Sequence, residues 1–338
     1  MENRAAVLYA AGDLRVEPVA VPEPKGREVL VEVKAVGVCG SDVHYYEHGR
    51  IGEFVVEQPM VLGHESAGVV VGLGPEATRH RVGDRVSMEP GVPCGRCREC
   101  RAGRYNLCPD VEFFATPPID GSFANYVVIH EDFAFALPDG VSDEEGALLE
   151  PLSVGIWACR KADVGPGDHV LVTGAGPIGL LAVQAARAAG ATAITITDVK
   201  PRRLEIARAT GATRALDVSA EPLADAGVEA DVLFECSGHP AALMDGIRAL
   251  RPAGRAVVIG MGPGEEATIP LAFLQNREIT LTGTFRYANT YPVAIDLVAS
   301  GRVDLGAIVT GRFGLDEAEA ALRSTREDPD MVKPMVIP

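Results

Sequence analysis

The sequence lacks two features that would place the chain in a membrane or outside the cell. No apolar run approaches the roughly 20 residues that a spanning helix needs. Residues 1–17 carry scattered charges where a secretion signal would have an apolar centre. We therefore expect a cytoplasmic chain without a membrane partner. In that compartment its seven cysteines are expected to be metal ligands or buried thiols rather than disulfides.

Positive charge is also scarce, because 31 Lys and Arg are outnumbered by 47 Asp and Glu, for a formal net charge of −16. Nucleic-acid binding needs clustered Lys and Arg, so the charge balance argues against such a partner. A dinucleotide is not excluded, because backbone N–H groups and a helix N-terminus hold its pyrophosphate. Internal repeats and low-complexity segments are absent, and 338 residues predict two globular domains.

Two kinds of hydrophobic pattern meet near residue 153. Earlier residues predict short strands separated by Gly and Pro, as in a barrel-like β domain, at 29–36, 68–72, 84–88 and 124–128. Later residues predict strands at 169–173, 193–197, 231–235, 256–259 and 278–281, with helices at 178–189 and 201–209. This alternation predicts βαβ crossovers and a parallel sheet. A helix at 292–299 and a strand at 332–337 follow, and we expect the C-terminal stretch to return to the first domain.

A glycine-rich motif follows the strand at 169–173. The run Gly174-Ala175-Gly176-Pro177-Ile178-Gly179 matches G-x-G-x-x-G and opens a helix, which is the context that this motif needs. The three glycines serve the tight turn, the approach of the backbone to the pyrophosphate, and close helix–strand packing. The alternative is a glycine turn that binds nothing.

Asp198 ends the next strand, about 20 residues on, where an acid binds the adenosine ribose. A carboxylate there repels the 2′-phosphate of NADP, so NAD is the expected cofactor. Arg203 is a candidate contact on the adenosine side, and a solvated helix arginine is the alternative.

Four cysteines are closely spaced in a lobe at about 90–110. Cys94, Cys97, Cys100 and Cys108 form C-x2-C-x2-C-x7-C, which favours a structural zinc with a closed four-sulfur shell. The competing interpretation is an iron–sulfur cluster, but the last gap is longer than in the bacterial pattern. A redox dithiol fits less well, because no such motif starts a helix after a strand. Cys159 and Cys236 are interpreted as small buried hydrophobic residues.

A second set of metal-binding residue types lies earlier in the chain. Cys39, within Gly37–Tyr45, and His64, within Gly63-His64-Glu65, suit a zinc that keeps an open coordination position. A single cysteine and a single histidine are usually just packed residues, so these residue types alone do not pair them.

Several runs resemble the zinc-containing medium-chain dehydrogenases, and among them the sorbitol (L-iditol) dehydrogenase branch. The matching runs are 39–52, 59–68, Phe114-Ala115-Thr116-Pro117-Pro118, 145–155, 174–179 and 285–290. The resemblance implies an α/β protein with a GroES-like β-rich catalytic domain at 1–152 and 287–338. It implies a Rossmann NAD-binding domain at 153–286, and a homotetramer or homodimer. The lobe cysteines vary within the branch, since many microbial members keep them and animal members lack them.

The resemblance also implies roles for individual residues. Cys39 and His64 match the catalytic zinc ligands, with Glu65 and Glu150 as the two nearby carboxylates, and the four lobe cysteines hold a second zinc. Which glutamate binds the catalytic metal directly stays open. Ser41 and His44 stand at the positions where members of this family pass the released proton to solvent. Substrate contacts match Tyr45, Glu150, Arg286 and Tyr287. Contacts to the nicotinamide side match Ile259, Gly260, Met261, Thr284, Phe285 and Arg286.

The implied reaction is the zinc-dependent oxidation of a secondary alcohol of a polyol, such as sorbitol, xylitol or L-iditol, to the ketose. Zinc polarises the hydroxyl as an alkoxide, and a hydride passes to NAD. One alternative keeps this chemistry and changes the substrate to threonine or another sugar alcohol. Another is an NAD-binding sensor or structural protein that performs no chemistry. The run Phe285–Thr290 favours polyols, and Cys39, His64 and Glu150 favour an enzyme.

Overall fold

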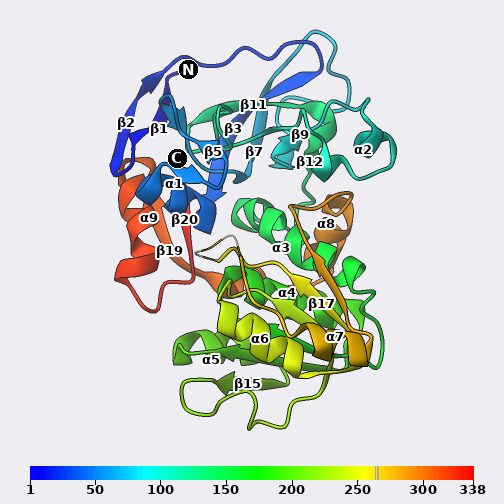
Figure 1. Ribbon diagram of the computed structural model, residues 1–338. Helices are drawn as coiled ribbons and strands as arrows, with labels where there is room; N and C mark the ends of the chain where they lie inside the picture. Colours follow the sequence, from blue (N-terminus) through cyan, green and yellow to red (C-terminus); the bar gives the residue numbers. More distant parts are fainter. Residues whose placement is uncertain (263, 265) are drawn as a thin grey trace. The chain divides into compact units, whose positions relative to one another are not determined.

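The computed structural model describes residues 1–262, 264 and 266–338, and it divides the chain into two compact units (Figure 1). The first unit is Met1–Glu150, Tyr291–Ala299 and Val309–Pro338, and the second is Pro151–Thr290 and Ser300–Ile308. The sequence placed all of 287–338 in the first domain. The structure instead gives 287–290 and 300–308 to the second unit. The Gln184 amide helps to hold 300–308 there through hydrogen bonds with the backbone N–H and C=O of Asp304 at 2.7 and 2.9 Å. Among the described residues, no helix has the length and apolar character of a membrane span.

The first unit is built on a seven-stranded sheet, in which only one neighbouring pair is parallel. Its order is β12 (Ala134–Ala136), β8 (Arg85–Met88), β7 (Glu65–Leu73), β3 (Glu28–Gly37), β20 (Lys333–Ile337) and β19 (Val309–Gly314), with β11 (Tyr126–His130) also on β3. A three-stranded sheet joins β2 (Asp13–Val19), β1 (Asn3–Ala10) and β6 (Met60–Val61). Two short pairs are β4 (Arg50–Ile51) with β5 (Phe54–Val55), and β9 (Gly91–Val92) with β10 (Glu112–Phe113).

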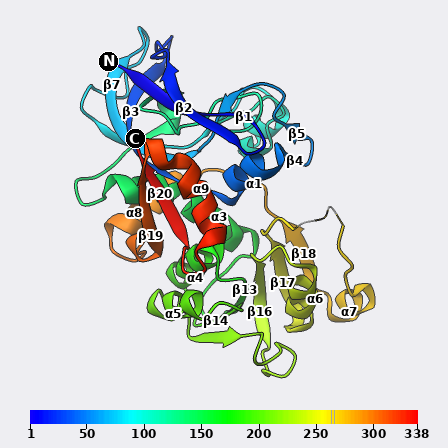
Figure 2. The ribbon, with the colours of Figure 1, turned by 90° about the vertical axis from the view of Figure 1, so that its left-hand side faces the viewer.

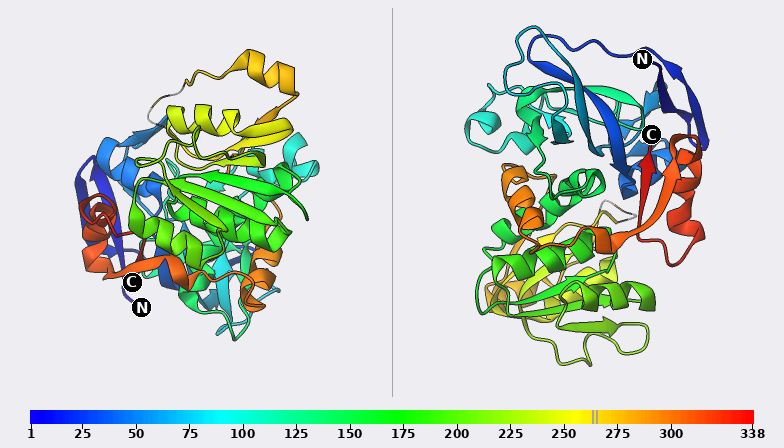
Figure 3. Two further views of the ribbon diagram at one scale, coloured as in Figure 1. Left: turned by 90° about the horizontal axis from the view of Figure 1, so that it is seen from below. Right: turned by 180° about the vertical axis from the view of Figure 1, so that it is seen from behind.

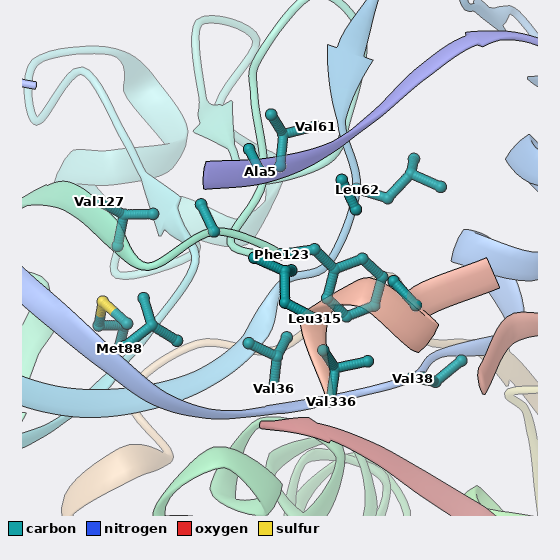
Figure 4. Packing of buried hydrophobic residues seen from close by; sticks show 14 of the residues in the cluster. Ala5, Val36, Val38, Val61, Leu62, Met88, Phe123, Val127, Leu315 and Val336 are labelled. Atoms are coloured by element: carbon teal, nitrogen blue, oxygen red, sulfur yellow. The ribbon is translucent and has the colours of Figure 1, made fainter. Parts of the chain in front are cut away.

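The C-terminal strand completes this sheet, since β20 pairs antiparallel with β3 through Met335 opposite Gly37. The pairing brings residues about 300 positions apart into one core. Side chains from β1, β3, β20 and the loop before β7 meet there around Phe123 (Figure 4). Phe123, Leu62 and Val336 are fully buried, so this core includes residues close in sequence to the start of β7 and residues of the C-terminal strand.

Helices of the first unit border these sheets. They are α1 (Gly40–His48), α2 (Arg98–Arg101), α8 (Tyr291–Ala299), α9 (Ala318–Glu327) and the 3₁₀ turns η1 (Tyr105–Leu107), η2 (Glu131–Phe133) and η4 (Leu315–Glu317). The long helix α3 (Asp143–Lys161) begins in the first unit and ends in the second. Among these helices and turns, only α8 was predicted from the sequence, at 292–299.

The second unit is a six-stranded parallel sheet with helices on both faces (Figures 2 and 3). The order is β15 (Arg214–Asp217), β14 (Ala193–Asp198), β13 (His169–Thr173), β16 (Ala230–Glu235), β17 (Leu250–Val258) and β18 (Thr280–Gly283). The connecting helices are α4 (Pro177–Ala189), α5 (Pro201–Ala209), α6 (Pro240–Arg248) and α7 (Leu271–Arg277), and η3 (Gly306–Ile308) also belongs here. The strand order reverses between β13 and β16, and such a switch point is where doubly wound sheets bind ligands.

Candidate active site

Three possible metal ligands come together at the adjoining ends of β3 and β7. Cys39 lies two residues after β3, His64 directly precedes β7, and Glu65 is the first residue of β7. Gly37 pairs with Glu65 across the two antiparallel strands. One ligand atom from each of the three side chains lies within 4.8 Å of the others. A thiolate, an imidazole and a carboxylate at this spacing form a donor set that suits zinc.

Two glycines make room for this cluster. A Cβ on Gly37 would stand 2.0 Å from Glu65 Oε2, so only glycine lets that carboxylate lie across the strand. Gly63 has φ +88°, and a Cβ on it would stand 2.7 Å from the Phe123 ring. Glycine adopts this backbone conformation without strain, which turns the chain just before His64.

Asp42 organises the cluster from behind, and the sequence analysis missed it. Its carboxylate accepts hydrogen bonds from the backbone N–H of Cys39 at 3.0 Å and of Gly63 at 2.9 Å. Its Oδ1 also lies 3.6 Å from Nδ1 of His64. A buried carboxylate behind a ligand histidine fixes the ring orientation. The available signal was an acid three residues after Cys39, at the capping-box position of α1.

The electrostatics of His64 reflect these neighbours. Burial lowers the pKa of the imidazole, but the charges of Asp42 and Cys39 outweigh burial and raise the pKa well above its usual value. The ring of Phe113 packs against His64 with 5.8 Å between centroids. The pocket around His64 therefore attracts positive charge.

Glu65 has a buried partner that sequence reasoning also missed. Lys333 Nζ donates to Glu65 Oε1 at 2.6 Å, and among the described lysines and arginines only Lys333 is buried. The same ammonium lies 2.6 Å from Glu65 Oε2, so Lys333 is ion-paired with both carboxylate oxygens. No sequence pattern pointed to Lys333, which lies 268 residues away.

Glu150 is buried in α3, next to Pro151 inside the helix. It does not belong to the group of three ligand atoms, but its charge raises the pKa values of Lys333 and of buried Glu89. Burial is the larger cause for Glu89 and, with Glu150, raises the pKa of that carboxyl to about 7. Of the two predicted carboxylates, Glu65 therefore lies with Cys39 and His64, and Glu150 lies outside this group of three ligand atoms.

The predicted relay and substrate residues lie on both units. Ser41 and His44 are half-buried on α1, and Tyr45 on the same helix is buried. Arg286 and Tyr287 belong to the second unit. Arg286 has φ +54° and places its guanidinium 4.8 Å from the centroid of the Phe285 ring, while Tyr287 is buried.

The four lobe cysteines converge as their spacing predicted. The sulfur atoms lie within 4.8 Å of one another, and the Cys97–Cys100 and Cys94–Cys108 pairs are 3.4 and 3.5 Å apart. Sulfurs bound to one tetrahedral zinc at about 2.3 Å would be roughly 3.8 Å apart, so the cluster needs little adjustment to hold the ion. Hydrogen bonds from the backbone of Arg96 and Cys97 lower the pKa of the Cys94 thiol to about 7.

In the second unit the glycine-rich loop lies at the end of β13. Gly174 has φ +86°, and a Cβ on Gly179 would stand 1.9 Å from Gly174 O, so both need glycine. Gly176 caps α4, whose first residues are Pro177 and Ile178, and the space beside it is open. This arrangement leaves a helix N-terminus ready for a phosphate group.

Asp198 supports this loop directly. Its carboxylate accepts hydrogen bonds from Ala175 N at 2.6 Å and from Val199 N and Lys200 N at 2.8 and 2.9 Å. A cavity of about 380 Å³ opens beside it, lined by Gly174, Asp198 and Ser237 among others. Arg203, half-buried on α5, has an Nε with no hydrogen-bond partner.

Buried Glu235, at the end of β16, holds the loop that follows this strand, and it was not identified from the sequence. Its carboxylate accepts hydrogen bonds from Ser237 N at 2.8 Å and Gly238 N at 3.0 Å. Its carbonyl accepts from Ile259 and Gly260, both at 2.8 Å. Nearby, Thr284 N donates to Val258 O at 3.0 Å, whereas Met261 and Phe285 are exposed.

Comparison with known proteins finds a dehydrogenase domain match in each of the two units. Residues 25–139 match the alcohol dehydrogenase GroES-like domain, and residues 177–300 match the zinc-binding dehydrogenase domain. The sorbitol dehydrogenase of Bacillus subtilis is 44% identical, covering 99% of this chain and 97% of that protein. The human sorbitol dehydrogenase is 44% identical, covering 96% and 93%. A solved Escherichia coli dehydrogenase of unknown specificity superposes with a TM-score of 0.95 at 38% identity, covering 100% and 99%.

These findings confirm the predicted fold class, a GroES-like domain with a Rossmann domain. They confirm zinc and NAD as the cofactors of the enzyme, and the two donor sets fit two zinc ions. The chain belongs to the zinc-containing medium-chain alcohol dehydrogenases, in the branch of the sorbitol dehydrogenases.

Proposed function

We propose that the chain oxidises a secondary hydroxyl of a small polyol to the ketose, with NAD as the hydride acceptor. The observation that carries this proposal is the cluster of Cys39, His64 and Glu65, whose ligand atoms lie within 4.8 Å of one another. The likeness to sorbitol dehydrogenases over 96% or more of the chain supports a polyol rather than threonine.

Cys39, His64 and Glu65 would hold the catalytic zinc. When bound, zinc supplies Lewis acidity to the substrate oxygen. The chain's own residues then orient the donor set, because Asp42 holds the backbone at both Cys39 and Gly63. Glu150 contributes negative charge next to the cluster without joining its three ligand atoms.

Ser41 and His44 would carry the released proton away. Both are half-buried on α1, which begins directly after Cys39. A hydroxyl and an imidazole that reach both substrate and solvent can pass a proton along hydrogen bonds. Tyr45, with Arg286 and Tyr287, would bind the further hydroxyls of the substrate, and such a site rejects analogues that lack them.

NAD would bind at the carboxyl ends of the strands of the parallel sheet, with its pyrophosphate at Gly174–Gly179. The open space beside Gly176 and the positive φ of Gly174 support this placement. Asp198 would accept hydrogen bonds from the adenosine ribose, with Arg203 beside it. Ile259, Gly260, Met261, Thr284 and Phe285 would line the nicotinamide side.

The test is NAD reduction by the purified protein across sorbitol, xylitol, other polyols, ketoses and threonine, with zinc measured on the same sample. We expect turnover with polyols and two zinc ions per chain. The variant C39S should lose turnover and one zinc ion, whereas C159A, which removes a buried thiol of the second unit, should keep both. Oxidation of threonine without response to any polyol would overturn the substrate assignment.

We also propose a homodimer or homotetramer in the cytoplasm. Resemblance to the family supports the assembly, and light scattering of the purified protein tests it. A monomer at working concentration would contradict the proposal.

A further inference from the structure

A buried lysine stands against the proposed metal site, and the reaction gives it no task. Lys333, 2% exposed, donates to Val38 O at 2.9 Å and to Glu65 Oε1 at 2.6 Å. Glu65 itself is fully buried. Burying a cation is costly unless it is paired and hydrogen-bonded. The buried ammonium of Lys333 therefore needs the carboxylate of Glu65 as its counter-charge.

The strand register delivers this lysine to the cluster. Lys333 is the first residue of β20, and Val38 N donates to Pro334 O at 3.0 Å where β20 runs beside β3. That register places Lys333 across from Cys39. The ammonium thus reaches Glu65 from the C-terminal strand, independently of the turn at Gly63 that presents His64.

The negatively charged groups next to Lys333 are the same groups that would bind a metal ion. The Lys333 ammonium lies 2.6 Å from the carboxylate of Glu65, which belongs to the same group of possible metal ligands as Cys39 and His64. A zinc ion would draw on the same thiolate and carboxylates. Two cations that share one buried set of anions compete for it, because each weakens the attraction that the other feels.

We propose that Lys333 is an internal counter-cation that positions Glu65 and competes with the metal ion for it. This inference rests on the proposed assignment of Cys39, His64 and Glu65 as ligands. In the metal-free chain Lys333 neutralises the buried anions and keeps the cluster preformed. In the metal-loaded chain it stays paired with Glu65 and weakens the site's affinity for the ion.

The experiment compares K333M with the parent protein in metal-free and zinc-loaded forms. We expect K333M to lower the melting temperature of the metal-free form more than that of the loaded form. Zinc should bind about tenfold more tightly, as chelator competition would show. Cobalt(II) in the catalytic site should give altered visible absorption bands, because Glu65 is released to the metal. The neutral variant K333Q repeats the measurement if K333M does not fold.

The matched control is R27M, which removes another ion pair to a fully buried glutamate of the first unit. Arg27 Nε donates to Glu131 at 2.7 Å, so R27M should destabilise both forms equally and leave zinc affinity unchanged. If K333M behaves like R27M, or binds zinc more weakly, the proposal is wrong. Failure of the ligand assignment looks different, because C39S would then still bind two zinc ions.

Discussion

Asp42 holds its Oδ1 3.6 Å from Nδ1 of His64 while its carboxylate also binds the backbone at Cys39 and Gly63. One buried side chain therefore positions two proposed ligands that come from different strands. We expect D42N to weaken zinc binding about 10- to 100-fold, because the ring loses the negative charge that orients it. Chelator competition measures the change. The exposed D316N variant serves as control, and unchanged affinity in D42N would remove Asp42 from the site.

The turn before His64 depends on glycine. In G63A the added Cβ would meet the Phe123 ring at 2.7 Å while the backbone stays at φ +88°. Strain and overpacking together should cost about 3 kcal/mol of unfolding free energy. Urea denaturation tests this against G165A, where an added Cβ meets nothing within 4 Å. Equal stability of the two variants would contradict the expected clash.

Asp198 should set the preference for NAD over NADP. The variant D198N keeps an oxygen that can accept from Ala175 N but loses the charge that repels a 2′-phosphate. We expect the ratio of kcat/KM for NAD to that for NADP to fall at least about tenfold. D217N, at the end of the neighbouring strand β15, should leave the ratio unchanged. If NAD preference survives in D198N, another residue excludes the phosphate.

Glu89 should make stability depend on pH near neutrality. Its pKa is raised from 4.5 to about 7, so the folded chain binds this proton more strongly than the unfolded chain. Stability therefore falls as pH rises from about 4.5 through 7. The variant E89Q still accepts from Tyr105 and avoids this loss, gaining up to about 3 kcal/mol over the parent at pH 8 and nothing near pH 4.5.

Urea denaturation at both pH values measures this difference. Exposed Glu57, changed to Gln, should leave the pH dependence as in the parent. Parallel stability curves for E89Q and the parent would show that Glu89 does not titrate in this range.

The lobe metal should matter for stability rather than chemistry. C100S removes one of four converging sulfurs and should reduce zinc from two ions per chain to one. The first unit should melt earlier, because structural zinc contributes folding free energy. Turnover per remaining zinc should persist, in contrast to C39S. Complete loss of turnover in a folded, zinc-containing C100S protein would assign the lobe a catalytic part.

Local sequence patterns determined much of this protein. The strand at 169–173 and the helix at 201–209 have the predicted bounds, because apolar periodicity and a proline start define them. The glycine-rich loop and the four-cysteine lobe were also predicted from the sequence, because the residues that form each of them are close together along the chain. The amphipathic helix α9 was missed although its buried residues Ala318, Ala321 and Leu322 recur at helical spacing.

Only the tertiary structure decided the pairs that shape the sites. Lys333 reaches Glu65 because β20 inserts beside β3, and Gln184 holds Asp304 because residues 300–308 return to the parallel sheet. The proximity of Glu65 to Cys39 and His64 likewise follows from the pairing of Gly37 with Glu65. Sequence spacing cannot report such contacts, because strand register and chain return depend on the packing of the whole core.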